Sequence, residues 1–187
     1  PSKPDAAPLS AKSIKNIHGV LHKALKQDGL IGYLRTNPSE ACILPRIVRK
    51  EMHPLEEDQV AVFLREVQEH PHEYLYKIAL FTGLREGEVL GLGWEHIDFQ
   101  TGTLTVKRQL RREQKKGGRY YFSPPKNNKS RCLTLASSVI QLFRLQKLEQ
   151  NSMRMEAGDA WEEHGLIFTN QIGGCLPLRT VYDCFKR

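Results

Sequence analysis

The sequence predicts an α+β fold that is mainly helical and contains one small three-stranded antiparallel sheet. Apolar residues recur at helical spacing in several segments, whereas residues 103–107 alternate polar and apolar side chains and include β-branched ones. The chain has 187 residues, of which 40% are hydrophobic, and this is enough to bury a core. Because so small a sheet is not stable alone, we expect it to pack on the helices.

The first expected helix begins at Ser10, and Gly29 is expected to end it because glycine commonly closes helices. Asn37 and Pro38 mark a turn after it. Its lysines lie mostly away from the apolar side, so the helix is amphipathic with a basic flank. The apolar residues at helical spacing are Ile14, Ile17, Leu21 and Leu25.

Five further helices are expected over about residues 55–70, over 74–81, from 86, from 138 and over 178–185. Ser138 and Gln141 form a capping-box signature at the start of the longest of them. The apolar residues expected on the buried side of that helix are Val139, Leu142, Phe143, Leu145 and Leu148.

The three expected strands cover residues 103–107, 119–123 and 131–135. Between the first two strands, Gly117 and Gly118 suit the exposed tip of a hairpin. These strands are expected to form the three-stranded sheet.

The composition favours a nucleic-acid partner, because the formal net charge is +7. No apolar run is long enough to cross a membrane, and residues 1–8 lack the pattern of a signal peptide, so we expect a cytoplasmic location. No glycine-rich nucleotide loop or carboxylate cluster indicates a cofactor or a metal. The four cysteines are widely spaced and are expected to be reduced core residues: Cys42, Cys132, Cys175 and Cys184.

Arg85 is the first candidate site residue. The apolar segment 74–81 runs into Gly83, and Glu86 then suits the first turn of a new helix, so Arg85 is expected in a bend. There its planar fork of donors, together with backbone N–H groups, suits a phosphate oxygen. Glu88 lies three residues later and is expected to orient the guanidinium, the alternative being a solvated ion pair.

Residues 82–98 resemble the first active-site motif of the tyrosine recombinases, the phage and transposon integrases. That motif reads T-G-L-R-x-x-E-(apolar)-x-x-L-x-W-x-x-(I/V)-D, and this chain has one glycine more than usual, near Gly91 and Gly93. The resemblance implies a DNA breaking-rejoining catalytic domain in which Arg85 is catalytic and Glu88 supports it. The matching residues are Thr82, Gly83, Leu84, Arg85, Glu88, Val89, Leu92, Trp94, Ile97 and Asp98.

The loop at residues 125–131 resembles a second element of this family, P-K-T/G-x-x-S-x-R, whose lysine reaches the DNA at the scissile step. Lys126 occupies that position, and the resemblance implies that it is the general acid that protonates the leaving sugar oxygen. Lys129 and Arg131 are expected to make ordinary phosphate contacts, which is also the alternative for Lys126.

The resemblance also implies a domain organisation. Residues 1–43 are expected to be the C-terminal part of a helical core-binding domain, including its last long helix. Residues 44–52 are expected to be an interdomain linker, and residues 53–187 the N-terminal part of the catalytic domain. The basic residues Arg46, Arg49 and Lys50 of the linker are expected to contact the DNA backbone.

By this resemblance the intact protein is a site-specific recombinase of a phage or transposon, which cuts DNA through a covalent phosphotyrosyl intermediate and rejoins it without a cofactor. Its expected partners are double-stranded DNA and further copies of itself, a tetramer in the recombination synapse. The family's H-x-x-R motif and nucleophilic tyrosine do not occur here, so this fragment is expected to be inactive, with Tyr182 a packing residue. One alternative is a non-catalytic DNA-binding protein on the same scaffold, and a less favoured one is a relative of the type IB topoisomerases.

Overall fold

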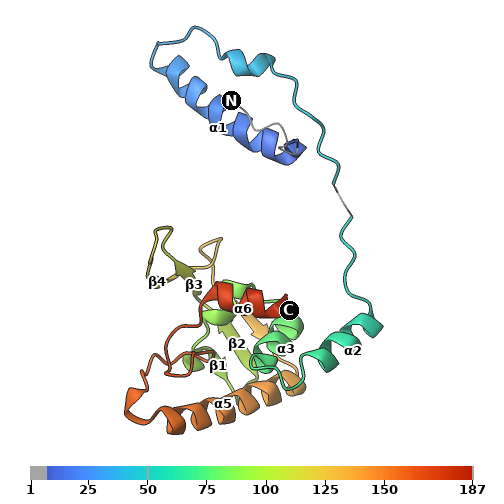
Figure 1. Ribbon diagram of the computed structural model, residues 1–187, viewed down its shortest axis with the longest axis vertical. Coiled ribbons are helices and arrows are strands. Elements are labelled where there is room, and N and C mark those ends of the chain that lie inside the picture. The colour runs from blue at the N-terminus through green and yellow to red at the C-terminus, as the bar shows by residue number, and fades with distance from the viewer. Residues whose placement is uncertain (1–7, 50, 187) are drawn as a thin grey trace. The chain divides into compact units, whose positions relative to one another are not determined.

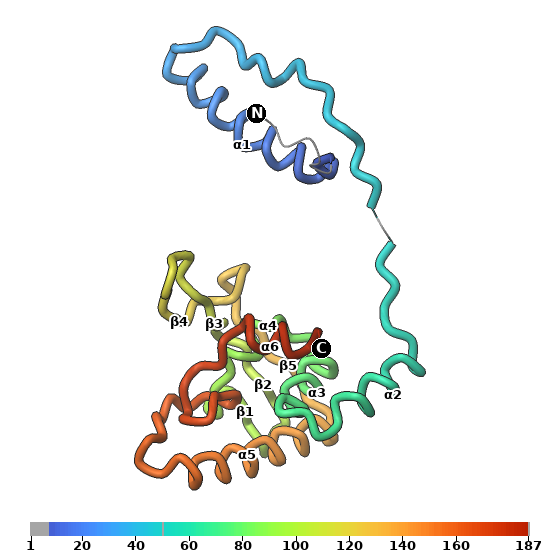
Figure 2. Tube along the Cα trace, viewed as in Figure 1, coloured from blue at the N-terminus to red at the C-terminus, as the bar shows by residue number. Residues whose placement is uncertain are grey.

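The computed structural model describes residues 8–49 and 51–186 and separates into two compact units, which divide between Pro54 and Leu55 (Figure 1). In the described part of the segment at 42–56, the chain forms no helix or strand, as its course in Figure 2 shows.

The first unit consists of helix α1 (Ala11–Leu30) and a short 3₁₀ helix at Pro38–Ala41. Ser10 caps α1 as expected, because its hydroxyl oxygen accepts a hydrogen bond from the backbone N–H of Ser13 at 3.1 Å. The helix continues past Gly29 to Leu30, so the expected end is one residue early. No residue of α1 is buried within this unit, and its apolar side is largely exposed.

The second unit contains the other five helices, and all five expected helical segments are present. Their bounds are α2 (Glu57–Glu66), α3 (Glu73–Thr82), α4 (Glu86–Leu90), α5 (Ser137–Ala157) and α6 (Leu178–Phe185). Short 3₁₀ helices lie at Trp94–His96 and Gly158–Ala160. The capping box predicted at Ser138 is wrong, since α5 begins one residue earlier and no side chain caps it.

The main sheet has three antiparallel strands in the order β1-β2-β5, but one of them is not the strand that we expected. Strands β1 (Ile97–Asp98) and β5 (Arg131–Thr134) flank β2 (Thr103–Val106). Strand β4 (Tyr120–Ser123) instead pairs with β3 (Gln109–Arg112) in a separate two-stranded ribbon.

The pairing of β4 follows from the hairpin tip. A tight tip around Gly117 and Gly118 places the strand after it opposite the strand immediately before it, and this is β3. Both edges of β2 are already occupied by β1 and β5, so β2 has no edge left for β4. Figure 2 shows the ribbon and the loop after it projecting from the body of the unit.

The hydrophobic core lies between the helices and the main sheet, and α5 packs against α3. Its largest fully buried apolar side chains include Ile78, Leu90, Leu104, Phe143 and Ile167, which come from every part of the unit. The exposed positions of Cys42 and Cys132 contradict the expectation that all four cysteines are core residues, although all four are free thiols.

The buried side of α5 agrees with the expected one at Val139 and Phe143, which are buried, but differs from it in the C-terminal half of the helix. Leu148 is 63% exposed, whereas Gln146 and Gln150 are buried. Both glutamines donate side-chain hydrogen bonds to backbone carbonyls at residues 166–167, which would otherwise be buried without donors. The buried side of α5 therefore continues from Val139 and Phe143 through these two glutamines and not through Leu148.

Candidate active site

The bend that holds Arg85 forms as the sequence predicts. Helix α3 ends at Gly83, whose φ of 62° lies in the left-handed region that favours glycine. Arg85 has extended backbone angles, and α4 begins at the next residue. The Arg85 side chain is 63% exposed, so its guanidinium is accessible to a ligand.

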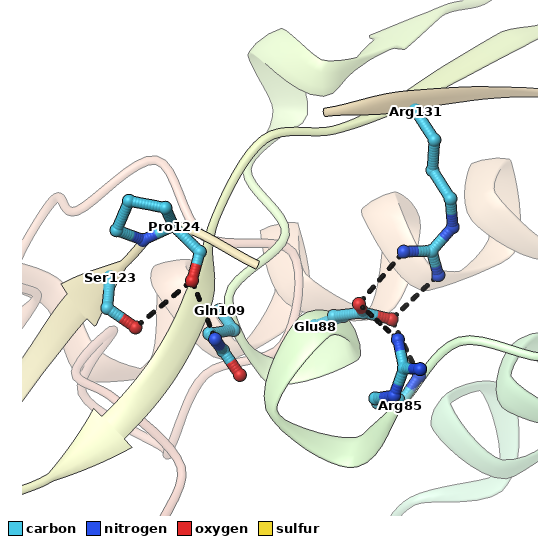
Figure 3. A network of polar contacts seen from close by, with 6 residues as sticks. All are labelled: Arg85, Glu88, Gln109, Ser123, Pro124 and Arg131. Atoms are coloured by element: carbon cyan, nitrogen blue, oxygen red, sulfur yellow. Dashed lines mark hydrogen bonds and ion pairs between the residues drawn. The ribbon is translucent and has the colours of Figure 1, made fainter. Parts of the chain in front are cut away.

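Glu88 lies beneath this bend and is almost completely buried, with 1% of its side chain exposed. Its Oε2 accepts a hydrogen bond from the backbone N–H of Arg85 at 2.9 Å, and its Oε1 accepts one from Nη1 of Arg85 at 3.2 Å. The expected contact between Glu88 and the guanidinium is therefore present (Figure 3).

Arg131 supplies a second guanidinium to the same carboxylate, from the first residue of β5 and 43 residues along the chain (Figure 3). Its Nη1 donates to Oε1 of Glu88 at 2.9 Å, and its Nη2 donates to Oε2 at 2.8 Å. This is the two-point pairing that arginine forms best with a carboxylate. Arg131, which we expected to contact DNA phosphates, thus has both terminal nitrogens directed at Glu88.

The charges in this cluster hold Glu88 ionised. Hydrogen bonds from Arg131, followed in effect by those from Arg85, lower the pKa of Glu88 to about 2, although burial by itself would raise it. The same pairing raises the pKa of Arg131. A buried carboxylate without these partners would be very costly, so Glu88 depends on both arginines.

Lys126 lies in an exposed turn that follows the ribbon. The backbone N–H of Asn128 donates to the carbonyl oxygen of Pro125 at 2.7 Å, which closes the turn with Lys126 at its second position. The start of the loop is fixed as well, because Nε2 of Gln109 donates to the carbonyl oxygen of Pro124 at 2.6 Å (Figure 3). Five residues after Lys126, the loop leads into Arg131.

The structure therefore brings Arg85, Glu88 and Arg131 into direct contact and places Lys126 in the loop attached to that cluster. Lys129 is exposed in the same loop. Arg46 and Arg49 are exposed in the extended segment of the first unit, and Lys50 lies outside the described residues.

Arg108 and Gln109, which connect the ribbon to α4 and to the Lys126 loop, were not predicted from the sequence. Arg108 donates from Nε to the carbonyl oxygen of Gly91 at 2.9 Å, and its guanidinium lies 4.3 Å from the ring centre of Phe122. The glycine pair at 117–118 was the available signal for this strand, because a hairpin tip there requires a strand shortly before it.

The close packing of α4 against β3 explains the additional glycine of the motif. A Cβ atom at Gly91 would lie 2.9 Å from the backbone nitrogen of Leu110, which is too close for any side chain. A Cβ atom at Gly87 would lie 2.9 Å from the carbonyl oxygen of Leu110. Two small residues therefore allow α4 to lie directly against β3.

Two further findings apply to the described residues. They contain no group of three or more side chains suited to holding a metal ion. Their helices include none that is long and apolar enough to cross a membrane.

The chain is similar in sequence and in fold to known proteins of one family. Residues 52–187 match the model of the phage integrase family. The tyrosine recombinase XerC-like protein of Caldanaerobacter subterraneus subsp. tengcongensis is 26% identical over 95% of this chain and 50% of its own length. The chain spans about half the length of the curated relatives that it matches.

Two solved structures share the fold. The Tn1549 transposon integrase in complex with transposon right end DNA has a TM-score of 0.73 and 23% identity, over 94% of this chain and 59% of that one. A lambda integrase tetramer bound to a Holliday junction has a TM-score of 0.56 and 21% identity, over 95% of this chain and 46% of that one. The family match covers most of the chain, and the chain therefore belongs to the phage integrase family, the tyrosine recombinases.

Proposed function

We propose that this chain is part of a longer site-specific recombinase, in which Arg85 and Lys126 act on the scissile phosphate of double-stranded DNA. The observation that carries the proposal is the arrangement of Arg85, whose backbone and guanidinium are both bound by the buried Glu88 while 63% of the side chain stays exposed. A fixed and accessible cation of this kind suits a reaction in which negative charge builds up on phosphate oxygens.

In the proposed reaction, a tyrosine oxygen attacks the phosphorus atom and forms a phosphotyrosyl bond, while the bond to the leaving sugar oxygen breaks. Arg85 neutralises the nonbridging oxygens during this step, and Lys126 gives a proton to the leaving oxygen. Rejoining reverses these steps with a hydroxyl of another strand, so no cofactor or external energy is needed. The second arginine motif and the tyrosine belong to the longer protein in this proposal.

We assign residues 1–43 to the end of a core-binding domain, 44–52 to a linker and 53–187 to the first part of the catalytic domain. The exposed apolar side of α1 supports the first assignment, since such a face needs further helices to cover it. Linker residues Arg46, Arg49 and Lys50, together with Lys129, would contact DNA phosphates. The ribbon supports a DNA interface because it exposes further cations: Arg111, Arg112, Lys115, Lys116 and Arg119.

We further propose that the protein acts on DNA as a homotetramer in the cytoplasm and moves a phage or transposon. The lambda integrase tetramer on a Holliday junction supports this assembly by analogy. The alternative is a DNA-binding protein without catalytic activity, in which the same cations only contact phosphates.

A covalent adduct separates these two functions. Incubation of the longer protein with a nicked suicide substrate that carries its recombination site should give a protein–DNA adduct on a denaturing gel. Arg85→Ala should reduce adduct formation by about a hundredfold or more, because one lost oxyanion donor has an effect of that size. A matched control, Arg65→Ala, removes an exposed cation of α2 outside the site and should have no effect. Binding without any adduct from the wild-type protein would establish the alternative.

A further inference from the structure

We propose that Arg131 is a positioning residue, which holds Glu88 and thereby fixes both the direction of the Arg85 guanidinium and the start of β5 after the Lys126 loop. This inference rests on the function proposed above. It replaces the expectation that Arg131 is one of several phosphate contacts.

The hydrogen bonds of Glu88 are shared equally between the two arginines. Oε1 accepts from Nη1 of Arg131 and from Nη1 of Arg85, whereas Oε2 accepts from Nη2 of Arg131 and from the backbone N–H of Arg85. Because the two bonds from Arg131 fix the plane of the carboxylate, they also fix the two acceptor positions that Arg85 uses. Without Arg131, the carboxylate could rotate, and the guanidinium of Arg85 would no longer be held in one direction.

The two arginines differ in how much of their hydrogen-bonding capacity remains for a phosphate. Arg131 uses both terminal nitrogens on Glu88, and 37% of its side chain is exposed. Arg85 uses only Nη1, and within the described chain no hydrogen bond is formed by its Nε or Nη2. A phosphate at Arg131 would have to compete with a buried carboxylate, whereas Arg85 keeps one free edge of its fork.

Arg131 also anchors the loop that carries Lys126. It pairs with Val106 as the first residue of β5, and the other end of the loop is held by the bond between Gln109 and Pro124. Strand β3, which carries Gln109, lies against α4, which carries Glu88. The loop is therefore held at both ends by groups that contact α4. The same set of contacts positions both proposed catalytic residues, Arg85 and Lys126.

Two variants of Arg131 in the longer protein test this role. Arg131→Lys keeps the charge but cannot form the two-point bond, and Arg131→Met removes the charge. Arg65→Met is the matched control, because it removes an exposed cation of α2 outside the site. For both Arg131 variants we expect the cleavage rate at saturating DNA to fall by about tenfold to a hundredfold, since small misplacements have effects of that size. DNA affinity and its salt dependence should stay within about twofold of wild type for Arg131→Lys.

Other results would overturn the inference. If Arg131→Met weakens binding and lowers the salt slope by about 0.9 while the saturated rate is unchanged, then Arg131 is a phosphate contact. If the variants lower only the thermal midpoint, then the pair with Glu88 is merely structural.

A measurement on the 187-residue chain separates this inference from the proposed function. The ¹⁵Nε signal of Arg85 should show a restrained guanidinium in the wild-type chain and an averaged one in Arg131→Lys. An Arg85 that stays restrained in this variant contradicts the positioning role, whatever the catalytic result. Conversely, if Arg85→Ala cleaves as well as wild type, the proposed function fails while the structural part of the inference stands on the NMR result.

Discussion

The indole Nε1 of Trp94 donates a 2.7 Å hydrogen bond to the side-chain oxygen of Gln150, 56 residues later on α5. The amide nitrogen of the same glutamine donates to the carbonyl oxygens of Leu166 and Ile167 at 2.8 and 3.2 Å. One buried side chain therefore connects the end of the arginine motif, the long helix and the segment that precedes α6.

Gln150→Met should lower the free energy of unfolding by about 2–3 kcal/mol, because an isosteric apolar side chain leaves the indole N–H of Trp94 and the carbonyl of Leu166 without partners. The control is Leu148→Ala on the exposed side of α5, which should change stability by less than about 0.5 kcal/mol. Urea unfolding of both variants measures the difference. Equal effects would contradict the assignment of the buried side of α5.

Glu88 should give the protein a characteristic loss of stability in acid. The pKa of Glu88 is about 2 in the folded chain, against an ordinary 4.5, because Arg131 and Arg85 bind the ionised form. A folded pKa below the unfolded one stabilises the protein above pH 4.5, and this stabilisation is lost as the pH falls toward 2. The difference amounts to about 3 kcal/mol at about 1.4 kcal/mol per pH unit.

Urea unfolding of wild type and Glu88→Gln at several pH values tests this linkage. The stability gap between the two should be largest near neutral pH and should narrow between pH 4.5 and 2. Glu86→Gln is a control for which the change in stability with pH should have the opposite sign. Burial raises the pKa of Glu86, so ionisation of this carboxyl lowers the free energy of unfolding as the pH rises. A gap for Glu88→Gln that does not change with pH would contradict the ion pair.

The local parts of this site follow from the sequence, whereas its long-range contacts do not. The bend at Arg85 is predicted because Gly83 closes one helix and acidic residues open the next, and both are signals within a few residues. The pairing of Glu88 with Arg131 could not be predicted in this way. Arg131 lies on a different element, 43 residues away, and no local sequence pattern relates positions at that distance.

Strand β3 was not predicted because it, too, depends on a contact with another element. Only Leu110 is buried among its four residues, so the strand has no alternating pattern of its own and is defined by its pairing with β4. In the C-terminal half of α5, Gln150 is likewise buried in place of Leu148, and its hydrogen bonds reach backbone carbonyls far along the chain. Contacts between residues far apart in the sequence therefore decide which strands pair and which side of a helix is buried, where the local residue pattern allows more than one arrangement.

The 187-residue chain should bind duplex DNA with a strong dependence on salt, because its net charge is +7 and its loop and ribbon expose cations. Lys126→Ala, Lys129→Ala and Arg49→Ala should each lower the slope of log affinity against log salt by about 0.9. Arg154→Ala is the control, since Nη1 of Arg154 lies 3.0 Å from Oε2 of Glu163 in an ion pair on the second unit. A wild-type slope near zero would contradict the DNA interface.

The same chain should form no covalent adduct with a nicked suicide substrate. Tyr182 packs only in part, since the residue is 49% exposed on α6 and the ammonium of Lys186 lies 4.7 Å from its ring centre. A phenol with an ordinary pKa of about 10 needs an assembled cationic site to become a nucleophile. An adduct on a denaturing gel that disappears in Tyr182→Phe would show that the chain already contains its nucleophile.

A sulfur-substituted substrate tests most directly whether Lys126 protonates the leaving oxygen of the phosphate that Arg85 binds. In the longer protein at saturating DNA, Lys126→Ala should cleave ordinary DNA about a hundredfold or more slowly, whereas Lys129→Ala, which removes a proposed phosphate contact only, should cleave it at the wild-type rate. When sulfur replaces the leaving oxygen, no proton is needed, so Lys126→Ala should recover to within about tenfold of wild type. If Lys126→Ala cleaves the sulfur-containing substrate as poorly as ordinary DNA, Lys126 is not the general acid and the account of this site is wrong.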